Sequence, residues 1–339
     1  MRKGHLLSAD PGTLSRSKRA KGGGLSRCAE LWIADGQAAG WSARTLASRR
    51  DMLEKFKWWL AQEGESERLQ DISAEVVRFF LAYLRGDGVE ARWGNGALNA
   101  ARPARPSTVD TYYRCLRAFF NFAVREELLD ESPMRKLKPP RVPKDQVQPF
   151  TQEQAQALVD AAKASDQSLR NTALVLVLLD TGLRVGELCS FTVGDVDPET
   201  KALSVQGKGG KRRAVYLSTT VRRALWRYVE HERRLAGEDE PLFVASRGRA
   251  TDAGLTPNGI CKLFHRLGTV AGLRDVRCSP HTARHYFAVT MLRNGANLFE
   301  LQQLMGHEDL TMLRRYVMLA QADLALVHRK ASPANRLKI

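Results

Sequence analysis

Apolar residues in the first part of the chain recur every three or four positions, which is the spacing of amphipathic helices. Phe56 and its apolar neighbours fall on one face of a helix that opens near Ser42. Further helices are predicted to begin at Ser73 and at Ser107, and Gly86 ends the first of these two. This pattern predicts a bundle of about four helices, with the aromatic residues as packing groups.

The second half of the chain predicts a mainly helical domain that contains a small sheet. A capping signal at Thr151 and Gln154 opens its first helix, and residues 169–180 are apolar nearly all round, which is typical of a buried central helix. The expected strands are 193–196, 202–205 and 213–217, with a glycine-rich turn before the last. The expected later helices are 218–235, 256–270, 281–294, 297–305 and 310–327.

A segment rich in proline and basic residues separates the two helical regions, because its prolines forbid a continuous helix. The first residues mix Lys and Arg with Gly and Ser, as disordered arms do. A chain of 339 residues also favours two cores over one. The predicted organisation is a disordered basic arm (1–24), a helical domain (25–130), a Pro/basic linker (131–149), a second domain (150–330) and a C-terminal tail (331–339).

Composition narrows the class of protein. The longest apolar run is residues 173–179, too short to span a bilayer, and no apolar segment follows the basic N-terminus. The five cysteines are scattered and form no CxxC pair, which disfavours a disulfide framework or a zinc ribbon. We therefore expect a soluble, intracellular protein with no membrane partner.

The net charge of +16 points to a polyanionic partner. Residues 1–150 carry 26 Lys and Arg against 18 Asp and Glu, and residues 151–339 carry 27 against 19, so each part contributes +8. Both domains can therefore face the same polyanion, and nucleic acid is the leading candidate. A generally basic, solvated surface is the alternative.

Short motifs in the second half place several chemically active side chains in order along the chain. They are TGLRVGEL (181–188), QGKGGKRR (206–213), HTARH (281–285) and LMGH (304–307), followed by Tyr316 nine residues after His307. Each motif alone has an ordinary explanation. Arg184 can form a surface ion pair with Glu187, three residues on, and Lys208 can lie at an exposed hairpin tip.

The order and spacing of these motifs resemble the catalytic domain of the tyrosine site-specific recombinases, the phage integrase family. The resemblance covers about residues 147–330, and residues 25–130 resemble the helical, SAM-like core-binding domain of the family less specifically. It implies a mainly α fold with a small antiparallel sheet in the catalytic domain. It also implies two domains that form a C-shaped clamp on DNA.

The resemblance assigns six catalytic residues. Tyr316 is the nucleophile, Arg184 and Arg284 bind the phosphate, and His281 and His307 assist, with His307 donating a hydrogen bond to a non-bridging oxygen. Lys208 is the general acid for the leaving 5′-oxygen. Glu187 supports Arg184, and His285 has a structural role.

Some assignments stay open on the sequence alone. Lys211 competes with Lys208 for the role of acid, and Tyr286 is the nearest rival of Tyr316. A metal site made of His281, His285 and His307 is a poor alternative, because HExxH is absent and Arg284 would repel a cation. No cofactor or metal is expected.

The chemistry fits these residue types. A phenolic oxygen can attack phosphorus and form a covalent intermediate, and arginine forks can neutralise the charge that grows on the non-bridging oxygens. We therefore expect an enzyme of DNA recombination, integration or transposition that joins DNA through a 3′-phosphotyrosine without metal or ATP. The resemblance also implies a homo-tetramer on two double-stranded DNA sites, with an accessory DNA-bending protein as an optional partner, and a cytoplasmic, nucleoid-associated location is expected. The alternatives are an inactive DNA-binding accessory protein and a type IB topoisomerase-like relaxase of supercoils.

Overall fold

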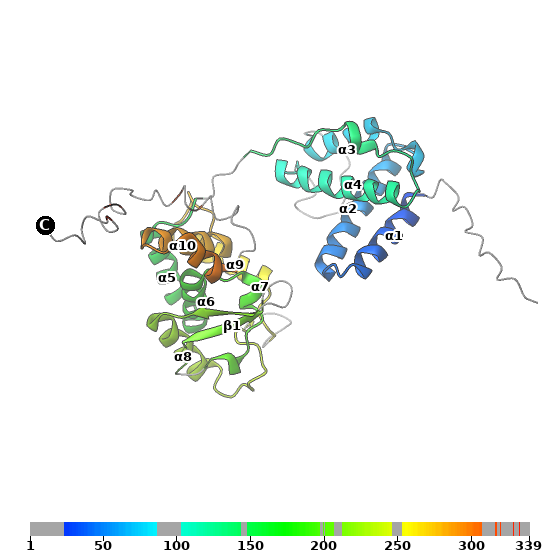
Figure 1. Cartoon of the computed structure of the whole chain (residues 1–339). Coiled ribbons are helices and arrows are strands. Elements are labelled where there is room, and N and C mark those ends of the chain that lie inside the picture. Colours follow the sequence, from blue (N-terminus) through cyan, green and yellow to red (C-terminus); the bar gives the residue numbers. More distant parts are fainter. Residues whose placement is uncertain are drawn as a thin grey trace, which may run out of the picture. The chain divides into compact units, whose positions relative to one another are not determined.

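The structure, a computed structural model, describes residues 24–86, 103–143, 148–196, 199, 201–206, 212–245 and 253–306, with residues 316, 319, 328 and 332 (Figure 1). Contacts divide the chain into two compact units, Met1–Asp145 and Gln146–Ile339. Several predicted features lie outside the described residues: the arm up to residue 23, the glycine-rich turn with Lys208 and Lys211, His307, and almost all of the helix at 310–327 and of the tail.

Unit 1 is a helical bundle. Its elements are α1 (Leu25–Ala38), α2 (Ala43–Gln62), the 3-10 helix η1 (Leu69–Asp71), α3 (Ala74–Arg85), α4 (Pro106–Arg125) and the 3-10 helix η2 (Pro133–Lys136). Ser42 and Ser73 cap α2 and α3 as predicted, since the Ser42 hydroxyl accepts from the Thr45 N–H and the Ser73 hydroxyl from the N–H groups of Glu75 and Val76. The expected start of α4 at Ser107 was one residue late, because Pro106 occupies the first turn.

Aromatic side chains fill the core of unit 1, as predicted. Phe56, Phe80, Phe119 and Phe120 are fully buried, and their rings meet edge to face, with centroids 4.8 Å apart for Phe56–Phe80 and 5.1 Å for Phe119–Phe120. The first part of the predicted linker also packs here. Met134 of η2 is buried in this core, and the Tyr113 hydroxyl donates to the Leu137 carbonyl at 2.7 Å.

Unit 2 is built around one buried helix, α6 (Ser168–Thr181), which confirms the prediction from its apolar sequence. Against it pack α5 (Gln152–Lys163), α8 (Thr219–Glu232) and α10 (Pro280–Arg293), and α9 (Pro257–Val270) packs against α5 and α10. A capping box between Thr151 and Gln154 opens α5, as the sequence indicates. Figure 1 shows α5, α6 and α10 side by side, with the sheet and α8 following.

Two antiparallel strands form the sheet of unit 2. They are β1 (Ala202–Gln206) and β2 (Arg212–Tyr216), and Leu203 pairs with Val215. The buried Leu203, Val205 and Val215 attach the sheet to the core of unit 2. The expected strand at 193–196 was wrong. Residues Val193–Asp195 form a 3-10 turn, η3, because the Asp195 carboxylate accepts from the Thr192 N–H and closes a local capping box.

Two short helices complete the described part of unit 2. The single-turn helix α7 (Val185–Leu188) follows α6, and α11 (Leu298–Met305) follows α10. A second, smaller apolar cluster packs α10 and α11 together, and it includes Phe287, Leu301, Met305 and Tyr316. Among the described residues, no helix combines the length and the apolar content needed to cross a bilayer.

Candidate active site

Arg184 owes its position to a sharp exit from α6. Gly182 has a φ of +59°, and a Cβ there would lie 2.4 Å from the Phe287 ring, so only glycine fits. The Thr181 hydroxyl accepts from the Leu183 N–H at 3.3 Å and supports the same turn. Arg184 then caps α7, and its side chain remains 43% exposed, which leaves the guanidinium open to a ligand.

Glu187 joins two arginines that are distant in sequence. Its carboxylate accepts from the Arg184 N–H at 2.9 Å and from the Arg184 guanidinium at 3.0 Å. It also accepts two bonds from Arg213, at 3.1 and 2.8 Å. Burial alone would raise the pKa of Glu187, but the bonds from Arg213 and Arg184 outweigh burial and hold that pKa below its usual value. The ionised carboxylate therefore fixes both guanidinium groups.

Arg284 is the buried member of the group. Its side chain is 5% exposed, and it donates to the carbonyls of Gly182 and Met305, the latter at 2.9 Å. Burial lowers the pKa of Arg284 to about 10, and the positive charge of Arg184 acts in the same direction. A charged guanidinium in this position is desolvated and lies near a like charge, so an anionic ligand would stabilise it.

Arg184, Arg213 and Arg284 meet at the carboxyl end of α11, and we call these three side chains with the carbonyls of residues 304–306 the arginine cradle. Arg213 donates to the Leu304 carbonyl at 3.3 Å, Arg284 to that of Met305, and Arg184 to that of Gly306 at 3.1 Å. The last carbonyls of a helix have no partner within it and carry partial negative charge. The end of α11 therefore holds three cations together.

Gly306 is required at this junction. It ends α11 in the left-handed conformation, with φ +62°, and a Cβ would lie 3.0 Å from the Arg213 guanidinium. The glycine therefore permits both the end of the helix and the close approach of Arg213.

His281 lies in the first turn of α10, behind the cap residue Ser279. Its side chain is exposed, and it lies one turn before Arg284 on the same helix. Partial desolvation, followed by the positive charges of Arg284, Arg277 and Arg184, lowers the pKa of His281 below its usual value. These charges place the imidazole in the electrostatic field of the cradle.

Tyr316 lies beside the cradle. Its side chain is 5% exposed and packs in the apolar cluster of α10 and α11. The phenolic oxygen lies 2.7 Å from Nδ1 of His285, the residue after Arg284, and Tyr316 and Arg284 interact electrostatically. The rival Tyr286 instead packs, partly buried, against the core of unit 2.

The structure therefore brings together Arg184, His281, Arg284 and Tyr316, four of the six predicted residues. Lys208 and His307 lie outside the described residues. Sequence reasoning missed Arg213 as a partner of Glu187 and missed the contact of His285 with Tyr316. The only sequence signals were the position of Arg213 inside QGKGGKRR and that of His285 inside HTARH.

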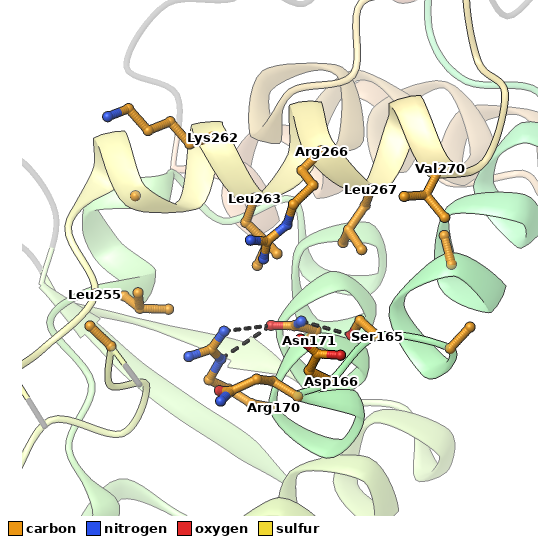
Figure 2. Close-up of a pocket in the computed structure, with 15 residues that line it drawn as sticks. Ser165, Asp166, Arg170, Asn171, Leu255, Lys262, Leu263, Arg266, Leu267 and Val270 are labelled. Atoms are coloured by element: carbon orange, nitrogen blue, oxygen red, sulfur yellow. Dashed lines mark hydrogen bonds between the residues drawn. The ribbon is translucent and has the colours of Figure 1, made fainter. Parts of the chain in front are cut away.

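A cavity of about 590 Å³ lies elsewhere in unit 2, between α9 and the connection of α5 to α6 (Figure 2). Figure 2 shows hydrogen bonds from Arg170 to Asn171 and from Asn171 to Ser165, and these three residues line the cavity. Among the described residues, none of the predicted catalytic side chains lines this cavity. The candidate active site is therefore the arginine cradle with Tyr316.

Comparison with known families agrees with this geometry. Residues 148–323 match the phage integrase family, and residues 32–139 match the phage integrase SAM-like domain. The chain belongs to the phage integrase family. The family comprises tyrosine recombinases, which are enzymes of site-specific recombination. The expectation of a tyrosine recombinase is therefore confirmed.

Named relatives support the same family. The chain is 30% identical to tyrosine recombinase XerA of Thermococcus kodakarensis (strain ATCC BAA-918 / JCM 12380 / KOD1), over 86% of this chain and 99% of the relative. It is 27% identical to tyrosine recombinase XerD of Oceanobacillus iheyensis (strain DSM 14371 / CIP 107618 / JCM 11309 / KCTC 3954 / HTE831), over 87% and 94%. The fold is similar to that of the Tn1549 transposon integrase in complex with a circular intermediate DNA, with TM-score 0.68, 17% identity, and coverage of 91% and 99%.

Proposed function

We propose that this member of the phage integrase family cuts and rejoins double-stranded DNA at specific sites, with Tyr316 as the nucleophile. The carrying observation is that the Tyr316 hydroxyl contacts His285, the residue after Arg284, and that Tyr316 interacts electrostatically with Arg284 of the cradle. A phosphodiester needs both a nucleophile and positive charge on its non-bridging oxygens, and this cluster offers both. The named relatives are recombinases, so the accessory-protein and topoisomerase readings are not favoured.

The described residues divide the work as follows. Arg184 is exposed and Arg284 is buried, and both lie in the cradle, so we assign them to the two non-bridging oxygens of the scissile phosphate. His281 lies on the same helix face as Arg284, and we assign it to the phosphate as a hydrogen-bond donor. Glu187 fixes the arginines and does not touch the substrate.

Two further assignments rest on the resemblance to the family alone. Lys208 is the general acid for the leaving oxygen, and His307 is a second hydrogen-bond donor to the phosphate. Both residues are adjacent in sequence to elements that the structure describes, which supports these assignments. Lys208 lies between β1 and β2, and His307 directly follows Gly306 of the cradle.

The reaction conserves the energy of the DNA backbone. The Tyr316 oxygen attacks phosphorus, the bond to the 5′-oxygen breaks, and this oxygen takes a proton from the acid. The product is a 3′-phosphotyrosyl bond and a free 5′-hydroxyl. Attack by a 5′-hydroxyl of another strand reverses these steps, so rejoining requires no ATP. Removal of one cradle donor is expected to lower the rate on the order of 100- to 1000-fold.

Binding to DNA rests on charge shared by both parts of the chain. The net charge of +16 predicts affinity that falls steeply with salt. We propose a homo-tetramer that pairs two DNA sites at the nucleoid, with an accessory DNA-bending protein as an optional partner. The apolar residues after Tyr316 are the proposed contact between protomers. Gel filtration of the protein with a DNA site tests this contact. Unchanged tetramer formation after truncation of the tail would refute it.

A suicide substrate tests the proposed function. Nicked duplexes with DNA from the flanks of the gene are incubated with the wild type and with Tyr316→Phe, without magnesium. A covalent protein–DNA band from the wild type alone is the expected result. A band that survives Tyr316→Phe would move the nucleophile to another residue. Tyr286→Phe serves as the matched control and is expected to keep the band.

A further inference from the structure

The phenolic oxygen of Tyr316 lies within hydrogen-bond distance of a side chain outside the six predicted catalytic residues. This partner is His285, whose Nδ1 lies 2.7 Å from the Tyr316 oxygen, with ring centroids 5.4 Å apart and planes inclined by 48°. The sequence predicted only a structural role for this histidine. The contact gives it direct access to the atom that attacks phosphorus.

The position of His285 is fixed by its neighbours. It directly follows Arg284, whose guanidinium donates to the carbonyls of Gly182, at the end of α6, and Met305, at the end of α11. Helix α10 packs against the central helix α6, and Phe287 contributes to the cluster around Tyr316. A side chain on such a rigid element is held in one place relative to the cradle.

The surroundings suit transfer of a proton between these two groups. A phenol is a weak nucleophile until it loses its proton, and an adjacent base is a common means of activation. The distance of 2.7 Å lies within the range for direct transfer, about 2.6–3.2 Å. Tyr316 is only 5% exposed, so bulk water has little access to the hydroxyl. Neutral imidazole protonated on Nε2 presents a lone pair on Nδ1, which can accept the phenolic hydrogen.

We propose that His285 is the general base that accepts the phenolic proton of Tyr316 during cleavage, an inference that rests on the proposed function. The O–H bond of Tyr316 breaks and its proton moves to Nδ1, while the oxygen forms a bond to phosphorus. The bond from phosphorus to the 5′-oxygen breaks, and that oxygen takes its proton from the separate acid. On rejoining, the departing phenolate recovers its proton from the His285 imidazolium.

The charged groups around His285 determine when it can accept a proton. The described ionisable groups of the site, besides Tyr316, are Arg284 and His281 on α10, Arg277 just before this helix, Arg184 and Glu187 at α7, and Arg213 on β2. An imidazolium formed among these arginines would be unfavourable in an empty site. A phosphate in the cradle, which gains negative charge as phosphorus is attacked, compensates for it. Proton transfer to His285 is thus tied to the presence of the substrate.

His285→Asn separates the transfer of a proton from the positioning of Tyr316. The oxygen of asparagine can occupy the place of Nδ1 and accept the same hydrogen bond, but it cannot take the proton. We expect both His285→Asn and His285→Ala to lower single-turnover cleavage of the suicide substrate on the order of 100- to 10,000-fold, with DNA affinity unchanged. His265→Asn, an exposed histidine of α9, is the matched control and is expected to cleave like the wild type. A His285→Asn rate near that of the wild type would reduce His285 to a positioning residue and overturn the proposal.

Two further measurements keep the test decisive if a variant folds poorly. The wild-type cleavage rate should rise with pH as the base loses its proton, and His285→Asn should lose this limb of the pH profile. A wild-type profile without such a limb contradicts the proposal. A substrate with sulfur at the 5′-bridging position needs no acid for its leaving group, so it should not rescue His285→Asn. Rescue would place His285 on the leaving-group side and refute its role as base.

The outcomes also separate this inference from the proposed function. The covalent band of the wild type can be lost in Tyr316→Phe and still form at the full rate in His285→Asn. This result would support the proposed function and refute the role of His285 as general base. Absence of the wild-type band, or its survival in Tyr316→Phe, removes the function and the base together.

Discussion

Glu187 accepts hydrogen bonds from both terminal nitrogens of Arg213, at 3.1 and 2.8 Å, across 26 residues of sequence. The pair is shielded from solvent, with side chains 10% and 14% exposed. Because Glu187 also binds Arg184, one carboxylate connects the exit of α6 to strand β2. The loss of this charge would therefore affect both the stability and the arrangement of the site.

Glu187→Gln is expected to destabilise the protein. The change leaves the sheltered Arg213 guanidinium without its negative partner, and breaking such a pair costs roughly 3 kcal/mol. Urea unfolding measures the loss. Glu230→Gln is the matched control, because Glu230 pairs with Arg234 at 3.8 Å on the surface and is 42% exposed. Equal, small effects of both changes would show that the Glu187 pair does not support the fold.

The same carboxylate predicts a dependence of stability on acid pH. The folded state holds the pKa of Glu187 below its usual value, so its contribution is complete above the unfolded pKa of about 4.3. This contribution is lost as pH falls through the lower, folded pKa, because the protonated carboxyl no longer binds the arginines as an anion. Unfolding free energies measured from pH 6 to about pH 3 should therefore fall less steeply in Glu187→Gln than in the wild type. Parallel curves would contradict this.

Gly306→Ala is expected to harm both stability and cleavage. The left-handed conformation at φ +62° costs an alanine about 1–2 kcal/mol, and the new methyl group would press on the Arg213 guanidinium 3.0 Å away. Gly272→Ala is the matched control, since Gly272 has φ +69° with no atom within 4 Å of a Cβ. Both variants should lose similar stability from the backbone, whereas only Gly306→Ala should slow single-turnover cleavage. Equal cleavage rates in Gly306→Ala and Gly272→Ala would show that the arrangement of the cradle does not affect catalysis.

The positive charges around His281 should be measurable at its imidazole. Desolvation, Arg284, Arg277 and Arg184 together lower its pKa below the usual value. Since the unfolded chain then binds the proton more readily, the contribution of His281 to stability is present above about pH 6.5 and declines below it. NMR titration of the imidazole in Arg277→Gln should give a higher pKa than in the wild type. Arg274→Gln, a nearby exposed change, should leave the pKa unaltered.

The aromatic residues of unit 1 should act in packing. Phe120 is fully buried and packs edge to face against Phe119, so Phe120→Ala is expected to cost about 3–5 kcal/mol in a denaturant titration. Phe79 lies on the exposed side of α3, where it is 56% exposed, and Phe79→Ala should change stability little. Loss of DNA affinity in Phe120→Ala with unchanged stability would instead indicate base stacking.

The sequence predicted best what depends on neighbouring residues. The caps at Ser42, Ser73 and Thr151 and the apolar face of α6 are local patterns, and the structure confirms them. The expected strand at 193–196 failed because a run of only four residues cannot reveal that one of them, Asp195, folds back on Thr192. Short patterns of this kind do not decide between a strand and a turn.

The site was predictable only where a family motif was present. The motifs pointed to Arg184, His281, Arg284 and Tyr316, and the structure brings these four residues together. The roles of Arg213 and His285 depend on contacts with residues 26 and 31 positions away, which no periodicity encodes. The three carbonyls that hold the arginines are backbone atoms, so the sequence carries no direct sign of them.

The arginine cradle carries more positive than negative charge. Glu187 bonds two of its three guanidinium groups, Arg284 bonds the Met305 carbonyl, and these four side chains carry a net charge of +2 (three minus one). A phosphodiester bound there completes the ionic arrangement, and a ligand that binds only the folded state raises the free energy of unfolding. DNA would then act as a structural component of this domain as well as its substrate. The protein would be most resistant to heat when it occupies its site, and stripping it of nucleic acid would weaken the fold that makes the reaction possible.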